Sequence, residues 1–175
     1  VIVVESIFSM DGDRAPLPDL IGLAERHGAE LIVDEAHAIG VCGPGGSGCV
    51  AAAGLSGRVL ATVYTCGKAL AAAGAFVCGS QKLREFLINR ARTFIFSTAL
   101  PPYFAAQVAA AMRLAAAADA ERAHLAEISA FLKNELTQNA FDTAGSDSHI
   151  VPVILGASDT AVNFAAQLRA RGFGV

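Results

Sequence analysis

The chain has 175 residues, of which 54% are hydrophobic and 17% charged, and its formal net charge is −3 at pH 7. So apolar a composition can offset the entropy of ordering by burial, which excludes a disordered protein and favours a folded domain plus part of another. The chain has no Lys/Arg cluster and no apolar run of roughly 18–20 residues, so we expect neither nucleic acid nor a membrane as a partner.

The four cysteines, Cys42, Cys49, Cys66 and Cys78, form no C-x-x-C pair and have no clustered histidines beside them. We therefore expect no metal site and interpret them as free thiols in a reducing cytoplasm. The chain opens inside an apolar run without an initiating methionine, and it ends where another strand would begin. We expect a piece of a longer cytoplasmic protein, truncated at both ends.

The first part of the chain predicts a strand, a helix and a second strand. Val1–Val4 is a short β-branched run typical of a strand buried on both faces, and Leu31–Val33 is a second such run that ends in Asp34. Between them, a helix is expected to start at Pro18 and to stop at Gly28. This order of elements is typical of a parallel sheet with a right-handed crossover.

The rest of the chain changes character at Pro101, from alternating strands and helices to mainly helices. Before Pro101 we expect a flexible glycine-rich loop at 40–48, strands at 59–65 and 74–79, a helix at 80–90 and a short strand at 93–96. After it we expect an alanine-rich helical stretch from 101 to about 139 that breaks near 118–119, an edge strand at 150–155 containing Pro152, and a helix at about 159–171. We predict that residues 1–118 belong to a large domain and that 119–175 begin a small α+β C-terminal domain.

Asp34 is the first candidate site residue. It lies at the carboxyl end of a predicted buried strand, where open α/β sheets bind their ligands. Its carboxylate can hold a cationic ring nitrogen, and His37, three residues later, can reach the same ligand. The alternative is that Asp34 only caps the following turn, as strand-ending aspartates often do.

Lys68 is the second candidate. The chain has three lysines; Lys82 and Lys133 lie in polar helical contexts and are interpreted as solvated, whereas Lys68 has no charged neighbour for several residues. Burial in such surroundings disfavours the ammonium form, and a neutral amine is the form that attacks an aldehyde. The alternative is a lysine that extends to the surface from an alanine-rich turn.

Together, Asp34 and Lys68 match the needs of pyridoxal 5′-phosphate (PLP). This cofactor requires a lysine that forms an imine with its aldehyde and an acidic group that keeps its pyridine nitrogen protonated. His37 is a candidate donor to the ring oxygen, and Thr65 a candidate ligand of the phosphate or of that oxygen. The sequence therefore predicts a PLP site with the cofactor bound covalently to Lys68.

Five stretches of the chain resemble signature segments of one family, in the family's order. They are Glu5–Asp13 with Ala15–Leu17, Val33–His37 with Gly40 and Gly43, Thr65–Leu70 with Gly74–Ala75, Phe96–Pro102, and Ser148–Val153. The chain is similar over essentially all of its length to the α-oxoamine synthases, which are related to the class II aminotransferases. The resemblance implies the aspartate aminotransferase-like fold called fold type I, here a mixed, mainly parallel sheet flanked by helices.

The resemblance also implies an activity and partners. Family members are homodimers with active sites at the subunit interface, and they condense an amino acid with an acyl thioester and release carbon dioxide. The stretch Phe96–Pro102 most resembles the branch that makes a biotin precursor from L-alanine and a pimeloyl thioester, carried by coenzyme A or by a carrier protein. Branches that use glycine share most of these residues and remain an alternative.

Carried over residue by residue, the resemblance gives Lys68 the imine and the proton transfers and places Asp34 on the pyridine nitrogen. It places His37 and Ser9 on the ring oxygen and Thr65 near the cofactor. Thr98 is expected to reach the phosphate of the neighbouring subunit. The family's ring-stacking histidine and its substrate-binding arginine are expected outside this chain, so the 175 residues alone are expected to be inactive.

Two other classes of function remain to be weighed. The run Gly43–Gly48 is a candidate phosphate-binding loop, although it lacks the G-K-[ST] ending, so an ordinary flexible loop is favoured. A non-catalytic remnant that acts as a scaffold, with the alanine-rich stretch Ala105–Ala118 as its partner surface, is the other alternative; packing of this helix against the large domain is favoured.

Overall fold

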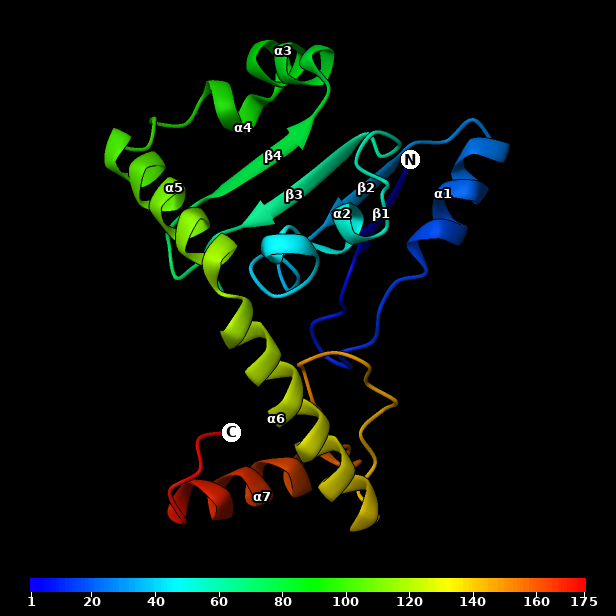
Figure 1. Cartoon of the computed structure of the whole chain (residues 1–175), viewed down its shortest axis with the longest axis vertical. Coiled ribbons are helices and arrows are strands. Elements are labelled where there is room, and N and C mark those ends of the chain that lie inside the picture. The colour runs from blue at the N-terminus through cyan, green and yellow to red at the C-terminus, as the bar shows by residue number, and fades with distance from the viewer.

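A computed structural model describes all 175 residues, and its centre is a four-stranded sheet with the strand order β1–β2–β3–β4 (Figure 1). The strands are β1 (Ile2–Glu5), β2 (Leu31–Asp34), β3 (Ala61–Thr65) and β4 (Ala75–Gly79). The helices are α1 (Leu17–Arg26), the 3-10 turn η1 (Pro44–Gly46), α2 (Cys49–Ala52), α3 (Gln81–Arg90), α4 (Arg92–Ile95), α5 (Pro102–Ala117), α6 (Asp119–Gln138) and α7 (Ser158–Ala170). The first three strands are parallel and β4 is antiparallel to β3, so the predicted mixed, mainly parallel sheet is confirmed.

One face of the sheet is covered by α1. Leu17, Ile21 and Ala24 recur at helical spacing, and all three are buried. Leu17 and Ile21 belong to a core that also contains Leu31 and Val33 of β2, neither of which is exposed to solvent. Burial of each large aliphatic side chain contributes about 2 kcal/mol, so this contact fixes α1 on the parallel strands.

The second core lies where α5 packs beside β3 and β4. Cys66 and Leu70 are buried there and contact partly buried side chains of α5 such as Val108. Tyr64 and Phe76 stack across β3 and β4 with ring centroids 4.9 Å apart. This packing supports the interpretation of the alanine-rich helix as a cover for the sheet.

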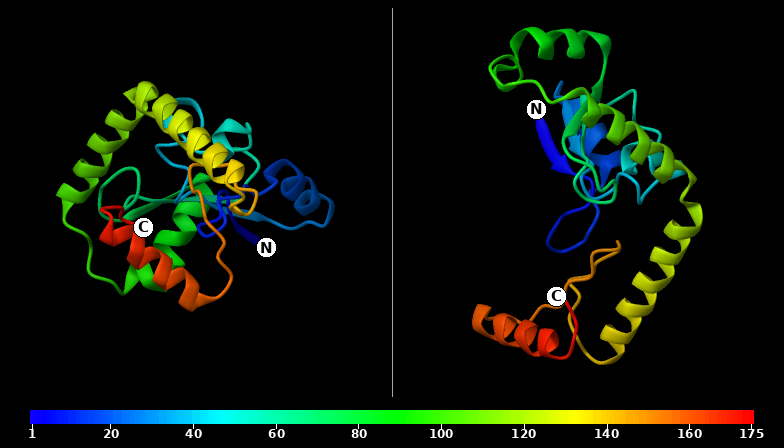
Figure 2. Two further views of the ribbon diagram at one scale, coloured as in Figure 1. Left: turned by 90° about the horizontal axis from the view of Figure 1, so that it is seen from below. Right: turned by 90° about the vertical axis from the view of Figure 1, so that its left-hand side faces the viewer.

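The long helical stretch breaks where it was expected to. Helix α5 ends at Ala117 and α6 begins at Asp119, with Ala118 between them. Helix α6 then leads away from the sheet, and α7 crosses near its far end (Figures 1 and 2). The division into a large and a small domain at this point stays a prediction. No helix of the chain has both the length and the apolar character needed to cross a membrane.

Three predictions about local structure were wrong. Residues 93–96 are not a strand, because helix α4 includes residues 93–95 and Phe96 is its C-cap. The segment 150–155 forms only an isolated bridge, between Ile154 and Asp142, since Pro152 removes one ladder donor and no other strand lies beside it. Strand β1 is not buried on both faces: Val3 is 70% exposed, because only the opposite face of this edge strand packs on the α1 core.

Candidate active site

The candidate site lies at the carboxyl ends of the three parallel strands. Glu5 at the end of β1 lies opposite Asp34, and Asp34 lies opposite Val63 of β3, two residues before β3 ends at Thr65. Parallel pairing in this register places the residues that follow β1, β2 and β3 at one edge of the sheet. This is the edge at which open α/β sheets bind ligands.

The structure shows the turn-capping role of Asp34, and its role towards a ligand stays a prediction. Its Oδ1 accepts a hydrogen bond from the Ala36 N–H at 2.7 Å, so the side chain does cap the turn. This bond fixes the orientation of the carboxylate at the strand end, where the side chain is half-buried. The capping bond therefore positions the group and does not compete with a role towards a ligand.

His37 is brought close to the other charged candidates. Burial lowers the pKa of His37 below its usual value, the positive charge of Lys68 lowers it further, and the charges of Glu5 and Asp34 act in the opposite sense. A neutral imidazole has one N–H donor and one acceptor nitrogen, which suits a hydrogen bond to a ligand oxygen. His37, Asp34 and Lys68 thus form one electrostatic cluster.

Lys68 lies in a turn within the connection between β3, which ends at Thr65, and β4, which begins at Ala75. The turn is closed by the Ala72 N–H, which donates to the Cys66 carbonyl at 2.9 Å, and by the Ala71 N–H, which donates to the Lys68 carbonyl at 2.9 Å. The expected burial of Lys68 is not found, since the residue is exposed in this chain. No side chain of the 175 residues covers it, so the surroundings that would desolvate its amine are not provided by this segment.

Thr65 has the strongest independent sign of a missing ligand. Its Oγ1 is buried and has no hydrogen-bond partner. A buried hydroxyl without a partner costs about 1–3 kcal/mol, so native structures rarely leave one unpaired.

Ser9 and Thr98 are not brought into hydrogen-bonding contact with this cluster. Ser9 is exposed in the loop after β1, which is closed by the Gly12 N–H donating to the Phe8 carbonyl at 3.0 Å. Thr98 is exposed in the segment before α5. Their predicted contacts with the cofactor stay predictions.

Glu35 is the important residue that sequence reasoning missed. It is 0% exposed, and its carboxylate accepts from the Ser6 hydroxyl at 2.8 Å and from the backbone N–H groups of Cys49 at 3.0 Å and Val50 at 2.6 Å. These bonds join the end of β1, the turn that carries Asp34 and His37, and the first turn of α2. The only signal in the sequence was a second acidic residue directly after Asp34.

The glycine-rich loop is closed by its own hydrogen bonds and by Glu35. The Gly40 N–H donates to the Gly46 carbonyl and the Gly48 N–H to the Cys42 carbonyl, both at 2.7 Å. A side chain on Gly48 would meet the Glu35 carboxylate at 2.8 Å, and φ of Gly48 is +100°. The chain's own carboxylate therefore takes the position that an anion would need, which argues against the phosphate-binding alternative.

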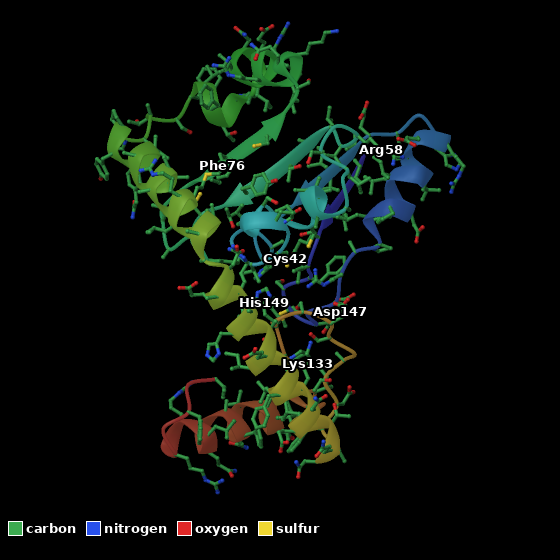
Figure 3. All side chains as sticks on the ribbon, viewed as in Figure 1. Cys42, Arg58, Phe76, Lys133, Asp147 and His149 are labelled. Atoms are coloured by element: carbon green, nitrogen blue, oxygen red, sulfur yellow. The ribbon has the colours of Figure 1, made fainter.

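A cleft of about 200 Å³ lies between α6, the segment 147–149 and the loops that follow β1 and β2. Figure 3 shows Cys42, His149, Asp147 and Lys133 gathered in this part of the molecule. Lys133 was expected to be solvated, but its amine donates a hydrogen bond to the Ser148 carbonyl at 3.0 Å. His149 has a buried Nδ1 without a hydrogen-bond partner.

Comparison with known proteins decides the family. Residues 1–175 match the family model of aminotransferase class I and II. The chain belongs to this family. It is 48% identical over 173 residues to the 8-amino-7-oxononanoate synthase of Anaeromyxobacter dehalogenans, covering 99% of this chain and 44% of that protein.

Solved structures agree with this assignment. A serine palmitoyltransferase variant from S. paucimobilis with a bound PLP–myriocin aldimine superposes with a TM-score of 0.90 at 30% identity, over 99% of this chain and 45% of that one. The 8-amino-7-oxononanoate synthase of Francisella tularensis gives a TM-score of 0.88 at 28% identity, over 99% and 52%. The predicted fold type I architecture and the resemblance to α-oxoamine synthases are confirmed. The chain spans about half the length of the relatives it matches.

Proposed function

We propose that the protein to which this chain belongs is a PLP-dependent C-acyltransferase that condenses L-alanine with a pimeloyl thioester to 8-amino-7-oxononanoate. The observation that carries the proposal is the cluster of Asp34, His37, Thr65 and Lys68 at the carboxyl ends of β2 and β3. The 48% identity to a protein of that name supports the choice of substrates.

The residues present fit the cofactor. The buried Thr65 Oγ1 lacks a partner and can donate to a phosphate or ring oxygen. The Asp34 carboxylate, fixed by its bond from Ala36, supplies the negative charge that a protonated pyridine nitrogen needs. The half-buried His37 supplies a donor for the ring oxygen, with Ser9 as the proposed second donor. Lys68 is the amine that would attach to the cofactor aldehyde.

Each residue then has a defined task. PLP, when bound, supplies an electron sink for negative charge at the amino-acid α-carbon. Asp34 would keep a proton on the ring nitrogen, because an opposite charge stabilises the protonated form. The Lys68 amine, once released by the incoming amino acid, would take the α-proton as general base and later return it. His37 would hold the ring oxygen by a hydrogen bond.

Other parts of the proposal concern the assembly. A homodimer with Thr98 at the phosphate of the neighbouring subunit fits the exposed position of Thr98 before α5. Delivery of the pimeloyl group by coenzyme A or by a carrier protein, and a cytoplasmic location, belong to the same proposal. The isolated 175 residues are expected to have no measurable synthase activity, since Lys68 is exposed in them.

The test uses the full-length protein loaded with PLP. It is incubated with pimeloyl-CoA and with either L-alanine or glycine, and carbon dioxide and the keto product are measured. We expect turnover with alanine to exceed turnover with glycine. Preference for glycine would replace the proposal by a glycine-using relative, such as glycine C-acetyltransferase or 5-aminolevulinate synthase. A full-length protein that forms a dimer but takes up no PLP in the loading step would support the non-catalytic alternative.

A further inference from the structure

Two cysteines at opposite ends of the glycine-rich loop meet one arginine. Arg14 Nη1 lies 3.6 Å from the Cys42 Sγ and 3.4 Å from the Cys49 Sγ, and it donates to both. The loop between the cysteines is closed by the Gly48 N–H, which donates to the Cys42 carbonyl at 2.7 Å. On the other side, the Cys49 N–H is held by the Glu35 carboxylate at 3.0 Å. The backbone therefore fixes both thiols beside one cation.

The two thiols are not equivalent. A hydrogen bond from the Cys49 thiol lowers the pKa of Cys42; burial opposes this shift, and the positive charge of Arg14 adds to it. The same hydrogen bond raises the pKa of Cys49, with burial acting in the same direction. At neutral pH Cys42 is the better nucleophile, since the thiolate is the reactive form, and Cys49 holds the proton.

Only one of the two thiols faces the cleft described above. Cys42 and Arg14 line it together with Arg122, Lys133 and His149, whereas Cys49 is not part of its lining. Figure 3 shows Cys42, His149 and Asp147 in the same part of the molecule. A small solute in the cleft therefore meets Cys42, whereas Cys49 does not line this cleft.

We propose that Cys42 and Cys49 form a redox-active pair in which Cys42 reacts with a hydroperoxide in this cleft and Cys49 closes a disulfide. In the first step the Cys42 sulfur attacks the peroxide, an S–O bond forms, the O–O bond breaks, and the leaving oxide takes a proton and departs as water or an alcohol. In the second step the Cys49 sulfur attacks Cys42, the S–S bond forms, and the hydroxyl group leaves as water with the Cys49 proton. The two thiols lose two electrons in total and the peroxide gains them.

The other two cysteines provide built-in controls. Cys66 is buried, and Cys78 is exposed but has no cation beside it. Burial raises the pKa of both thiols. Neither has a second thiol within hydrogen-bonding contact, so neither has the means to resolve an oxidised sulfur into a disulfide of this kind.

Trypsin separates the candidates cleanly. Cleavage after Arg26, Arg58, Lys68 and Lys82 places Cys42 and Cys49 together on residues 27–58, Cys66 on 59–68 and Cys78 on 69–82. The full-length protein is treated with one equivalent of hydrogen peroxide, free thiols are alkylated, and the peptides are weighed before and after reduction. We expect peptide 27–58 to lose two hydrogen atoms and to take up two alkyl groups only after reduction, while the other two peptides remain alkylated from the start.

Three variants sharpen the test. Cys49→Ser should leave a sulfenic acid on Cys42 that dimedone traps, Arg14→Gln should slow alkylation of Cys42 at pH 7 by about tenfold, and Cys78→Ser should change nothing. Oxidation of Cys78 at the same rate as peptide 27–58 would overturn the proposal. So would oxidation of Cys42 that leaves Cys49 free in the unmodified sequence.

Discussion

Residues 1–72 and residues 73–175 differ in how they bury their side chains. The first region contains all but three of the 25 buried residues; the exceptions are Ser129, Ser146 and Ser148. The second region leaves large apolar side chains in solvent, among them Phe94 and Phe96, which are 66% and 78% exposed. Asp34, His37, Thr65 and Lys68 all lie in the first region, whereas Thr98 lies in the second.

The comparison teaches which side chains this chain can position by itself. In the first region, Asp34 is held by Ala36, and Glu35 by three donors, so their geometry follows from contacts within the 175 residues. In the second region, Thr98 has no such contacts. Substitutions in the first region should therefore have the larger and more specific effects.

The largest expected effect is that of Lys68→Ala on activity. Loss of the amine that attaches the cofactor and moves the α-proton should remove the visible absorbance of the PLP-loaded full-length protein. It should also lower kcat by roughly 10²–10⁴-fold or more. Lys82→Ala, on the exposed face of α3, is the matched control and should leave both unchanged. A Lys68 variant that kept both the band and turnover would remove Lys68 from its role.

Asp34→Asn comes next. The amide keeps the size of the side chain but lacks the charge that holds a proton on the ring nitrogen, so kcat should fall by roughly a hundredfold with PLP still attached. Comparison of kcat with the absorbance of bound PLP separates this effect from loss of the cofactor. Unchanged turnover with full occupancy would show that Asp34 only caps its turn.

Glu35→Gln tests whether packing in the first region supports the site. The amide replaces one acceptor oxygen by a donor that faces backbone N–H groups, so the free energy of unfolding should fall by about 3 kcal/mol. Urea denaturation measures this change. Glu30→Gln, at an exposed position just before β2, should stay within about 0.5 kcal/mol of the unmodified protein. Equal stabilities of the two variants would contradict the positioning role of Glu35.

The contact between the two regions should depend on pH through His149. Burial lowers the pKa of His149, and the nearby positive charges of His37, Arg14 and Lys133 lower it further. The unfolded chain therefore binds more protons than the folded one between the depressed pKa and about 6.5, so stability should rise with pH through this window. His37 contributes in the same direction.

The measurement compares urea unfolding at pH 7.5 and pH 5.5. His149→Asn should reduce the difference between the two free energies, whereas His124→Asn, at an exposed position of α6, should leave it unchanged. The total effect should be smaller than that of Glu35→Gln, because His149 is only half-buried. A His149 variant with the full pH dependence would remove this residue as its source.

The smallest expected effect concerns the Lys68 turn. Ala71 has φ of +46°, a left-handed conformation that favours glycine. Ala71→Gly should therefore raise the free energy of unfolding by about 0.5 kcal/mol, while Ala73→Gly, without a positive φ, should lower it by a similar amount. Opposite signs for the two variants, measured by denaturation, are the test; a loss of stability at both positions would contradict the strain.

Much of the fold followed from local sequence patterns. The strand runs ending in Asp34 and Thr65 were found because β-branched residues cluster between turn residues. The break at Ala118 was found because Asp119 favours a new helix start. The short strand at 93–96 was wrong because four residues with β-branched and aromatic side chains do not distinguish a strand from one helical turn, and tertiary contacts decide.

The candidate site was only partly predictable. Asp34, His37 and Thr65 could be found because strand ends and family motifs mark them. Glu35 could not, since its three donors come from segments that only the folded chain brings together. The exposure of Lys68 could not be predicted either, because it depends on what covers the turn in space.

The central claim is that Lys68 is the residue to which PLP is attached. The most direct measurement is borohydride reduction of the PLP-loaded full-length protein, followed by trypsin digestion and peptide mapping. A reduced adduct on Lys68 blocks cleavage there and gives a peptide of residues 59–82 carrying the cofactor. An adduct on Lys82, on Lys133 or on a lysine outside this chain would contradict the account.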